Sequence, residues 1–410
     1  MTENHGGLYQ NLKELRDTEG RSSCNFFRSL GLDYLYVGEG NDIPSLIAAF
    51  AKVKDTSRPT VVHIHTQKGK GYAPAEADRE EFHWEMPFDL ETGKPKVDCS
   101  GMEDYHSLTG KFLLEKMKED HTVVAISSGT PTVIGFTPER RKQAGRQFVD
   151  VGIAEEHAVA LASGIAAGGG RPVYGVYSTF IQRCYDQLSQ DLCINGNPAV
   201  ITVFMGTVAG MNDVTHLGFF DIPLISNIPN MVYLAPTCSE EYFAMLEWAV
   251  RQTEYPVAIR VPGAAVVHRK EEFDTDYSEL NRYKMTARGE TVAILALGAF
   301  YDLGQALKNK LREESGVEAT LINPRYITGL DEPMLEELKV GHRIVVTLED
   351  GVLDGGFGEK IARYYGNSEM RVLNYGLRKE FADRYNLDEL MKANRLTDKQ
   401  MAEDIAGILE

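Results

Sequence analysis

The stretch "FVDVGIAEEHAVALASG", residues 148–164, places two acids and a histidine at the head of a run of small and apolar residues. A valine-containing run stops at Gly152 and a helical pattern begins at once, which predicts a strand followed directly by a helix. Consecutive helical residues point about 100° apart, so Glu155 and Glu156 cannot share one environment. The helix dipole favours an acid in the first turn by about 0.3–1 kcal/mol, which accounts for one of them. An acid at the carboxyl end of a parallel strand also lies where open α/β sheets bind ligands.

Apolar runs rich in valine and isoleucine alternate with helical patterns along the rest of the chain, which predicts βαβ units and parallel sheets. The first block holds about one such unit, with a helix at 42–55 and a strand at 60–67. This is too little to close a core, so either it packs on the second block or another polypeptide completes its sheet. The strands expected in the second and third blocks are 122–128, 147–151, 172–178, 199–205, 231–236, 257–262, 291–298, 318–324, 343–350 and 371–377.

The composition excludes several classes of protein. A net charge of −17 over 410 residues argues against nucleic acid or an anionic membrane surface as the main partner. The five cysteines are scattered without metal-like spacing, which is typical of a reducing compartment. No signal-peptide pattern opens the sequence and no apolar run approaches about 18 residues, so we expect a cytoplasmic protein.

Three glycine-rich stretches are more typical of turns than of phosphate sites. No Ser or Thr follows the lysine of "QKGKGY" (67–72), as a P-loop requires, and "GVLDGGFG" (351–358) lacks the dinucleotide-binding spacing. The acids and amide of "VGEGND" (37–42) have no matching metal ligands downstream. We therefore predict no metal site within this chain.

Two further clusters repeat the layout of the opening stretch. In "VYSTFIQRCYDQ" (176–187) a strand end is followed by small hydroxyls, Phe180 and Arg183, and in "NDVTHLGFFD" (212–221) His216 sits in a glycine-flanked loop after a strand. Each has an ordinary explanation, an amphipathic helix in the first case and a solvated histidine in the second. Three strand-end clusters in one block nevertheless predict a functional site.

Together these clusters resemble the thiamine-diphosphate-dependent transketolase superfamily, and within it the 1-deoxy-D-xylulose-5-phosphate synthases. The matching segments are "DVGIAEEHAV" (150–159), "YSTFIQRCYDQ" (177–187), "THLG" (215–218), "KGKGYAPAE" (68–76) with "FH" (82–83), and "GLDE" (329–332). The resemblance implies consecutive doubly wound α/β domains. We expect the C-terminal remnant of a diphosphate-binding domain at 1–85, a linker at 86–104, a pyrimidine-binding domain at 105–266 and a transketolase C-terminal domain at 285–410.

The resemblance also implies roles for seven residues. In the family, the glutamate of this motif hydrogen-bonds N1′ of the aminopyrimidine of thiamine diphosphate and promotes loss of the thiazolium C2 proton. It assigns catalysis to Glu155, His83 and His216, and cofactor contact to Glu155, Phe180, Tyr177, Tyr72 and Arg183. Glu156 is then the acid that helix electrostatics explains.

The sequence lacks the motifs with which the family binds the diphosphate group of the cofactor. Family members bind it through Mg²⁺ with a GDG motif and a later asparagine, and neither is present here. We therefore expect the ligands of Mg²⁺ to lie outside this chain. The expected assembly is a homodimer or a complex with a subunit that carries the N-terminal half.

A second departure concerns the substrate. The synthases hold the acceptor phosphate with arginines, and this chain has Met205 and Gly263 at those positions and Asn212 in place of an acid. Met and Gly cannot replace a bidentate guanidinium, so the sequence does not identify the acceptor substrate. The resemblance implies a transferase of isoprenoid biosynthesis that passes a two-carbon unit from a pyruvate-like donor to an aldehyde. The alternatives are the β-type subunit of a 2-oxo acid dehydrogenase-like enzyme and a non-catalytic assembly or regulatory paralogue.

Overall fold

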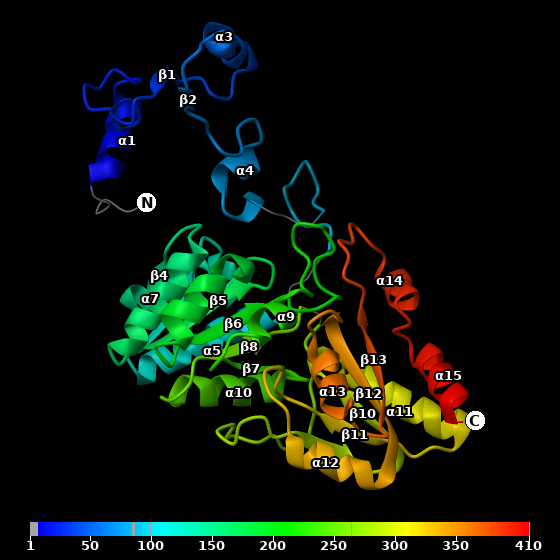
Figure 1. The fold of residues 1–410 in the computed structure, drawn as a ribbon. Helices are drawn as coiled ribbons and strands as arrows, with labels where there is room; N and C mark the ends of the chain where they lie inside the picture. Colours follow the sequence, from blue (N-terminus) through cyan, green and yellow to red (C-terminus); the bar gives the residue numbers. More distant parts are fainter. Residues whose placement is uncertain (1–6, 84–86, 98–100, 264, 410) are drawn as a thin grey trace. The chain divides into compact units, whose positions relative to one another are not determined.

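The computed structural model describes residues 7–83, 87–97, 101–263 and 265–409. The chain divides into two compact units, unit 1 at Met1–Met102 and unit 2 at Glu103–Glu410 (Figure 1). Part of the expected linker, residues 86 and 98–100, lies outside the described residues.

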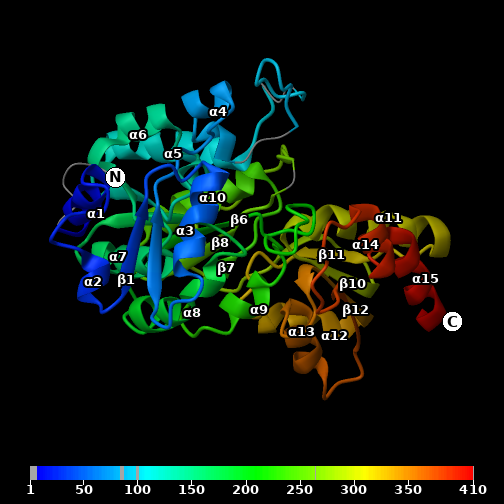
Figure 2. The ribbon, with the colours of Figure 1, turned by 90° about the horizontal axis from the view of Figure 1, so that it is seen from above.

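Unit 1 contains a two-stranded parallel sheet with short helices around it. Strands β1 and β2 lie side by side, with Leu35 opposite Val62 (Figure 2). The expected helix and strand of this block are confirmed as α3 and β2, whereas β1 was not among the predicted strands. The elements are α1 (Gly7–Asp17), α2 (Phe26–Ser29), β1 (Asp33–Val37), α3 (Ile43–Val53), β2 (Thr60–Ile64), α4 (Ala73–Ala77) and η1 (Glu81–His83).

The first sheet of unit 2 has six parallel strands in the order β4-β3-β5-β6-β8-β7. Every strand predicted for the second block is present. The strands are β3 (Val123–Ser127), β4 (Phe148–Asp150), β5 (Arg171–Tyr177), β6 (Val200–Phe204), β7 (Val232–Leu234) and β8 (Val257–Arg260). The helical segments are α5 (Tyr105–Glu119), η2 (Pro131–Ile134), α6 (Pro138–Ala144), η3 (Gly145–Gln147), α7 (Glu155–Ala167), η4 (Ile181–Cys184), α8 (Tyr185–Gln187), η5 (Leu188–Cys193), α9 (Asp221–Ser226) and α10 (Ser239–Arg251).

Both faces of this sheet are buried, as the continuous apolar strands require. Alternate residues of β5 belong to different cores: Tyr174 and Val176 pack with Ala158 and Ala162 of α7. Val173 packs with the opposite core, which includes α5 and α10. The small residues of α7 therefore let this helix lie close against the sheet.

The second sheet of unit 2 has five strands in the order β13-β12-β10-β11-β9. The four strands predicted for this block are confirmed, and a fifth, β9, was missed because it lies in and beside a charged stretch. It is antiparallel to β11. The elements are β9 (Lys284–Ala287), β10 (Thr291–Ala296), η6 (Gly298–Phe300), α11 (Tyr301–Ser315), β11 (Thr320–Asn323), α12 (Glu332–Gly341), β12 (His342–Val352), α13 (Phe357–Tyr365), β13 (Arg371–Leu377), α14 (Leu387–Ala393) and α15 (Asp398–Leu409).

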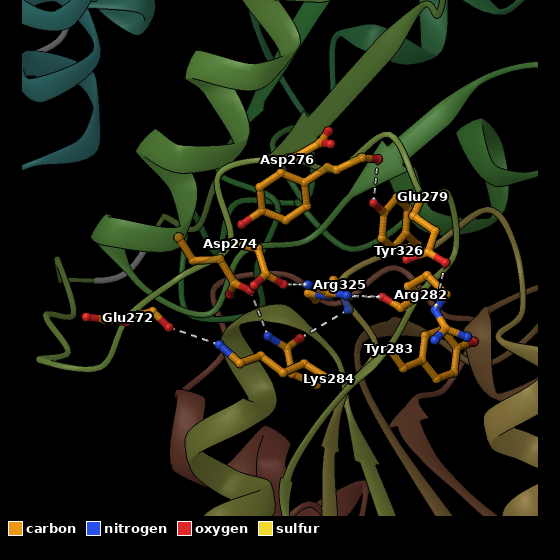
Figure 3. A network of polar contacts seen from close by, with 12 residues as sticks. Glu272, Asp274, Asp276, Glu279, Arg282, Tyr283, Lys284, Arg325 and Tyr326 are labelled. Carbon is orange, nitrogen blue, oxygen red and sulfur yellow. Dashed lines mark hydrogen bonds and ion pairs between the residues drawn. The ribbon is translucent and has the colours of Figure 1, made fainter.

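Arg325 ties the segment before β9 to the two sheets of unit 2 (Figure 3). Its guanidinium is 8% exposed, pairs with Asp274 and donates from Nε to the carbonyl of Arg282 over 2.9 Å. Its own carbonyl accepts the backbone N–H of Ala235, which follows β7, at 2.8 Å. These contacts satisfy a buried charge and hold the two domains of unit 2 in one arrangement.

Candidate functional site

The site lies at the carboxyl edge of the six-stranded sheet. In the order β4-β3-β5-β6, the chain moves to one side from β3 to β4 and to the other side from β5 to β6. The neighbouring strands β3 and β5 therefore form a topological switch point. In open α/β sheets, ligands bind in the crevice outside the carboxyl ends of the strands at such a point.

A tight turn carries the chain from β4 into α7. Gly152 has a φ of +73°, a left-handed conformation that glycine adopts without a steric penalty. The Asp150 carboxylate accepts the backbone N–H of Gly152 at 2.8 Å and that of Gly129 at 2.9 Å. Asp150 thus links the turns after β3 and β4 and places the first residue of α7 at the sheet edge.

The two acids of this turn lie in different environments, as predicted. Glu155 is 2% exposed, whereas Glu156 is exposed. The Glu155 carboxylate accepts a hydrogen bond from Nη1 of Arg183 at 3.2 Å, and the arginine side chain is itself 56% exposed. Burying a carboxylate is costly without such a partner, so Arg183 makes the interior position of Glu155 tenable.

Three aromatic side chains extend from this point along the edge of the sheet. The ring centroids of Tyr177 and Phe180 are 5.7 Å apart, and those of Phe180 and His216 are 5.4 Å apart, both edge to face. The Thr179 hydroxyl donates to the carbonyl of Thr215 at 3.1 Å and so joins the loops after β5 and β6. The structure therefore brings together five of the predicted site residues: Glu155, Tyr177, Phe180, Arg183 and His216.

A short polar relay orients the imidazole of His216. The Thr215 hydroxyl donates to the carboxylate of Asp213 at 2.5 Å, and Nδ1 of His216 lies 2.7 Å from the same hydroxyl oxygen. A hydroxyl has one proton, so the oxygen accepts the Nδ1 proton of the ring. Nε2 of His216 is then left as the proton acceptor in the neutral imidazole.

Two hydroxyls at the switch point lack hydrogen-bond partners. Oγ of Ser178, after β5, and Oγ1 of Thr130, after β3, are covered and make no hydrogen bond within the described part of the chain. Buried polar groups are normally paired, so each of these two hydroxyls is a candidate for contact with a polar ligand. The sequence signalled Ser178 through the small hydroxyls that follow its strand, but gave no signal for Thr130.

Met205, directly after β6, and Gly263, in the segment after the neighbouring strand β8, form an apolar contact. Met205 has a φ of +58°, and a Cβ added to Gly263 would lie 2.6 Å from its sulfur. The methionine therefore fills the space that a side chain at position 263 would need. The two positions that depart from the synthase pattern are coupled in space.

The loop after β6 is held by the segment before α14. The Tyr385 hydroxyl donates to the carbonyl of Val208 at 2.7 Å. The backbone N–H of Arg384 donates to the carbonyl of Asn212 at 2.6 Å, and the Asn212 amide donates to the carbonyl of Tyr385 at 3.0 Å. The C-terminal domain thus fixes the course of the loop that carries His216.

Tyr72 and His83 belong to unit 1. Tyr72 precedes α4 and packs against Phe82 and Phe88, and its buried hydroxyl has no partner among the described residues. Nδ1 of His83 lies 2.7 Å from Nζ of Lys68. Their assignment to the site stays a prediction.

The residues of unit 2 fit one part of thiamine diphosphate. A buried carboxylate, an aromatic ring and two unpaired hydroxyls suit an aminopyrimidine, which is flat and carries hydrogen-bonding nitrogens. By contrast, no group of three or more His, Cys, Asp or Glu side chains in the described ranges is placed to hold a metal ion.

Two domains of the chain match known domains. Residues 103–266 match the pyrimidine binding domain of transketolase, and residues 282–401 match the transketolase C-terminal domain. The 1-deoxy-D-xylulose-5-phosphate synthases of Clostridium tetani and Alkaliphilus oremlandii are 33% and 35% identical to the chain. These matches cover 98% and 92% of this chain, but 65% and 60% of the two synthases. The chain thus spans about two thirds or less of the length of these curated relatives.

Solved structures share the fold. A split-gene transketolase, solved as an inactive β4 tetramer, has a TM-score of 0.62 and 21% sequence identity, over 73% of this chain and 96% of its own. A Pichia stipitis transketolase in complex with sedoheptulose 7-phosphate has a TM-score of 0.60 and 14% identity, over 93% of this chain and 67% of its own. Among the described residues, no helix is long and apolar enough to cross a membrane.

Proposed function

Since the chain belongs to the transketolase family through its pyrimidine-binding and C-terminal domains, we propose that it takes part in thiamine-diphosphate-dependent transfer of a two-carbon unit. The donor is pyruvate-like and the acceptor is an aldehyde, as in the synthases that it resembles. The buried carboxylate of Glu155 at the carboxyl edge of the sheet is the observation that carries this proposal. The N-terminal half of the diphosphate-binding domain, with the Mg²⁺ ligands, comes from another polypeptide.

The side chains of unit 2 bind and orient the cofactor in this proposal. Thiamine diphosphate, when bound, supplies the carbanion chemistry of the reaction. Glu155 holds a proton at the ring nitrogen of the aminopyrimidine, and Arg183 keeps the carboxylate in place from the solvent side. Phe180 offers its ring as a packing surface, and Ser178 and Thr130, after β5 and β3, supply unpaired hydroxyls.

His216 acts toward the substrate. Its Nδ1 is occupied by the Thr215 hydroxyl, which leaves Nε2 to accept a proton or a hydrogen bond from a substrate hydroxyl. Its ring is half-buried against Phe180, and its loop is fixed by Tyr385. An oriented but partly exposed imidazole is suited to general acid–base work.

The acceptor in this proposal carries no phosphate. A guanidinium at position 263 would require Met205 to move, because the methionine sulfur occupies that space. An apolar contact in place of charge-assisted hydrogen bonds favours an uncharged aldehyde. The product therefore differs from that of the synthases in its charge.

Calorimetric titration of thiamine diphosphate with Mg²⁺ tests the proposal. The expected result is weak or no binding to this chain alone and tight binding once a polypeptide carrying the N-terminal half is added. Absence of binding in both cases would reject the enzymatic role and favour a non-catalytic paralogue. Oxidation of the donor in place of its transfer to an aldehyde would instead favour the β-type subunit of a 2-oxo acid dehydrogenase-like enzyme.

A further inference from the structure

Helix α3 of unit 1 exposes an apolar stripe. Ile43 and Ile47 are each 64% exposed and Phe50 is 54% exposed. Their spacing of four and three residues places them on one face of the helix. An amphipathic helix normally buries such a stripe, and here the only fully buried residue of the helix is Ala49.

The sheet beside this helix is also incomplete. Helix α3 contacts both β1 and β2, which pair only with each other in the described part of unit 1. Of their ten residues, only Val37 is fully buried. Parallel strands are normally covered on both faces and continued at their edges, so this two-stranded sheet lacks neighbours on several sides.

Exposed apolar side chains are concentrated in unit 1. The described residues of unit 2 expose single apolar side chains, such as Ile194 and Val340, on separate segments, and these form no matching stripe. Of the 17 large apolar side chains that are exposed among the described residues, ten belong to unit 1: Leu8, Phe26, Leu30, Ile43, Ile47, Phe50, Ile64, Leu90, Val97 and Met102.

We propose that the α3 stripe (Ile43, Ile47 and Phe50) and the open edges of β1 and β2 form a docking surface for a separate polypeptide that continues this parallel sheet. The inference rests on the proposed function, in which another chain supplies the rest of the diphosphate-binding domain. The match to the Clostridium tetani synthase leaves 35% of that protein, the remainder from 65%, without a counterpart in this chain. This missing portion is long enough for several strands and helices, whereas a second copy of unit 1 would add two strands.

Co-expression tests the docking surface. The full chain is combined with the N-terminal portion of the Clostridium tetani synthase that has no counterpart here, and complex formation is followed by light scattering and hydrogen exchange. We expect a one-to-one complex in which exchange at residues 43–53 slows by about tenfold or more. Ile47→Glu should weaken the complex by about 30-fold, as loss of a central apolar anchor does. Ile194→Glu, at a residue of unit 2 that is 67% exposed, should leave it unchanged.

Three outcomes would overturn the inference. One is the absence of a complex, and another is a complex that tolerates Ile47→Glu. The third is slow hydrogen exchange of α3 in the chain alone, which would indicate that unit 2 or a second copy of the chain already covers the α3 stripe. Binding is measured without cofactor, so a complex that forms as expected but takes up no thiamine diphosphate would reject the proposed function and leave the docking surface intact.

Discussion

The buried carboxylate of Glu155, whose side chain is 3% exposed, accepts a hydrogen bond at 3.2 Å from the guanidinium of Arg183, whose side chain is half-exposed. The acid comes from the first turn of α7, which follows β4. The arginine comes from η4, which follows β5, the next strand along the chain. The pair therefore joins the two strand-end motifs that first indicated a site. It also distinguishes the two adjacent acids, since Glu155 is buried and Glu156 is exposed.

Removing Arg183 should destabilise unit 2 more than removing the charge of Glu155. Arg183→Gln leaves a buried carboxylate without its guanidinium partner, which we expect to cost about 1–2 kcal/mol, less than a fully buried pair because the arginine is half-exposed. In Glu155→Gln/Arg183→Gln the loss should be mostly recovered. Urea unfolding of the four proteins measures the coupling, with Arg251→Gln, whose 76% exposed side chain pairs with Glu247, as control. Additive effects of the two substitutions would contradict the pairing.

Substituting Met205 should alter the choice of acceptor. Met205→Arg places a guanidinium beside Gly263, and one charge-assisted hydrogen bond to a phosphate is worth about 1.5–3 kcal/mol, or about tenfold or more in affinity. We expect the ratio of kcat/KM for glyceraldehyde 3-phosphate over glyceraldehyde to rise by about tenfold in the reconstituted enzyme. Val340→Arg, at a 91% exposed position, should leave the ratio unchanged. A wild-type protein that already prefers the phosphorylated aldehyde would show that other residues bind the phosphate of the acceptor.

Loss of the Tyr385 hydroxyl should loosen the loop that carries His216. Tyr385→Phe removes the donor to the carbonyl of Val208, which is buried, at a cost of about 1 kcal/mol. Hydrogen exchange of residues 208–216 should accelerate. Tyr364→Phe, whose hydroxyl bonds Glu336 on α12, serves as the matched control. Unchanged exchange in the 208–216 loop would show that Asn212 and its backbone contacts suffice to hold it.

The stability of unit 2 should fall as pH rises toward neutrality, because of Glu349. Burial raises the pKa of this carboxyl group from 4.5 to about 7, against the opposing effect of the backbone N–H groups of Gly358 and Phe357. Between these values the folded state binds more protons than the unfolded state, so the free energy of unfolding decreases with pH, by up to about 3 kcal/mol. The full effect is present above pH 7 and absent below about 4.5.

Glu349→Gln isolates this contribution. Urea unfolding between pH 5 and 8 should give a smaller decrease for Glu349→Gln than for the wild type, and Glu313→Gln, at an exposed acid of α11, should follow the wild type. Since burial raises the pKa of the neighbouring Asp350 to about 6, part of the pH dependence should persist in the variant. Equal slopes for Glu349→Gln and wild type would refute the assignment.

Most strands of the fold could be predicted from the sequence, because parallel strands that are buried on both faces appear as continuous apolar runs. The two missed strands lack that signal: β1 is half-exposed, and β9 is a four-residue antiparallel edge strand within a charged region. Helix geometry predicted that Glu155 and Glu156 lie in different environments, which is confirmed, but only the family resemblance singled out Glu155, the acid that is buried. The contact of Met205 with Gly263 was not predictable, since spacing along the chain does not report which side chains meet after β6 and β8 pair.

The central claim concerns Glu155, and its most direct test is Glu155→Gln measured beside Glu156→Gln. Both substitutions are made in the chain assembled with its N-terminal half, and cofactor-dependent turnover of pyruvate is followed. The account predicts that Glu155→Gln lowers kcat by about 100-fold or more with the circular dichroism spectrum unchanged, whereas Glu156→Gln stays near wild type. Turnover near wild type in Glu155→Gln would contradict the role given to the buried acid.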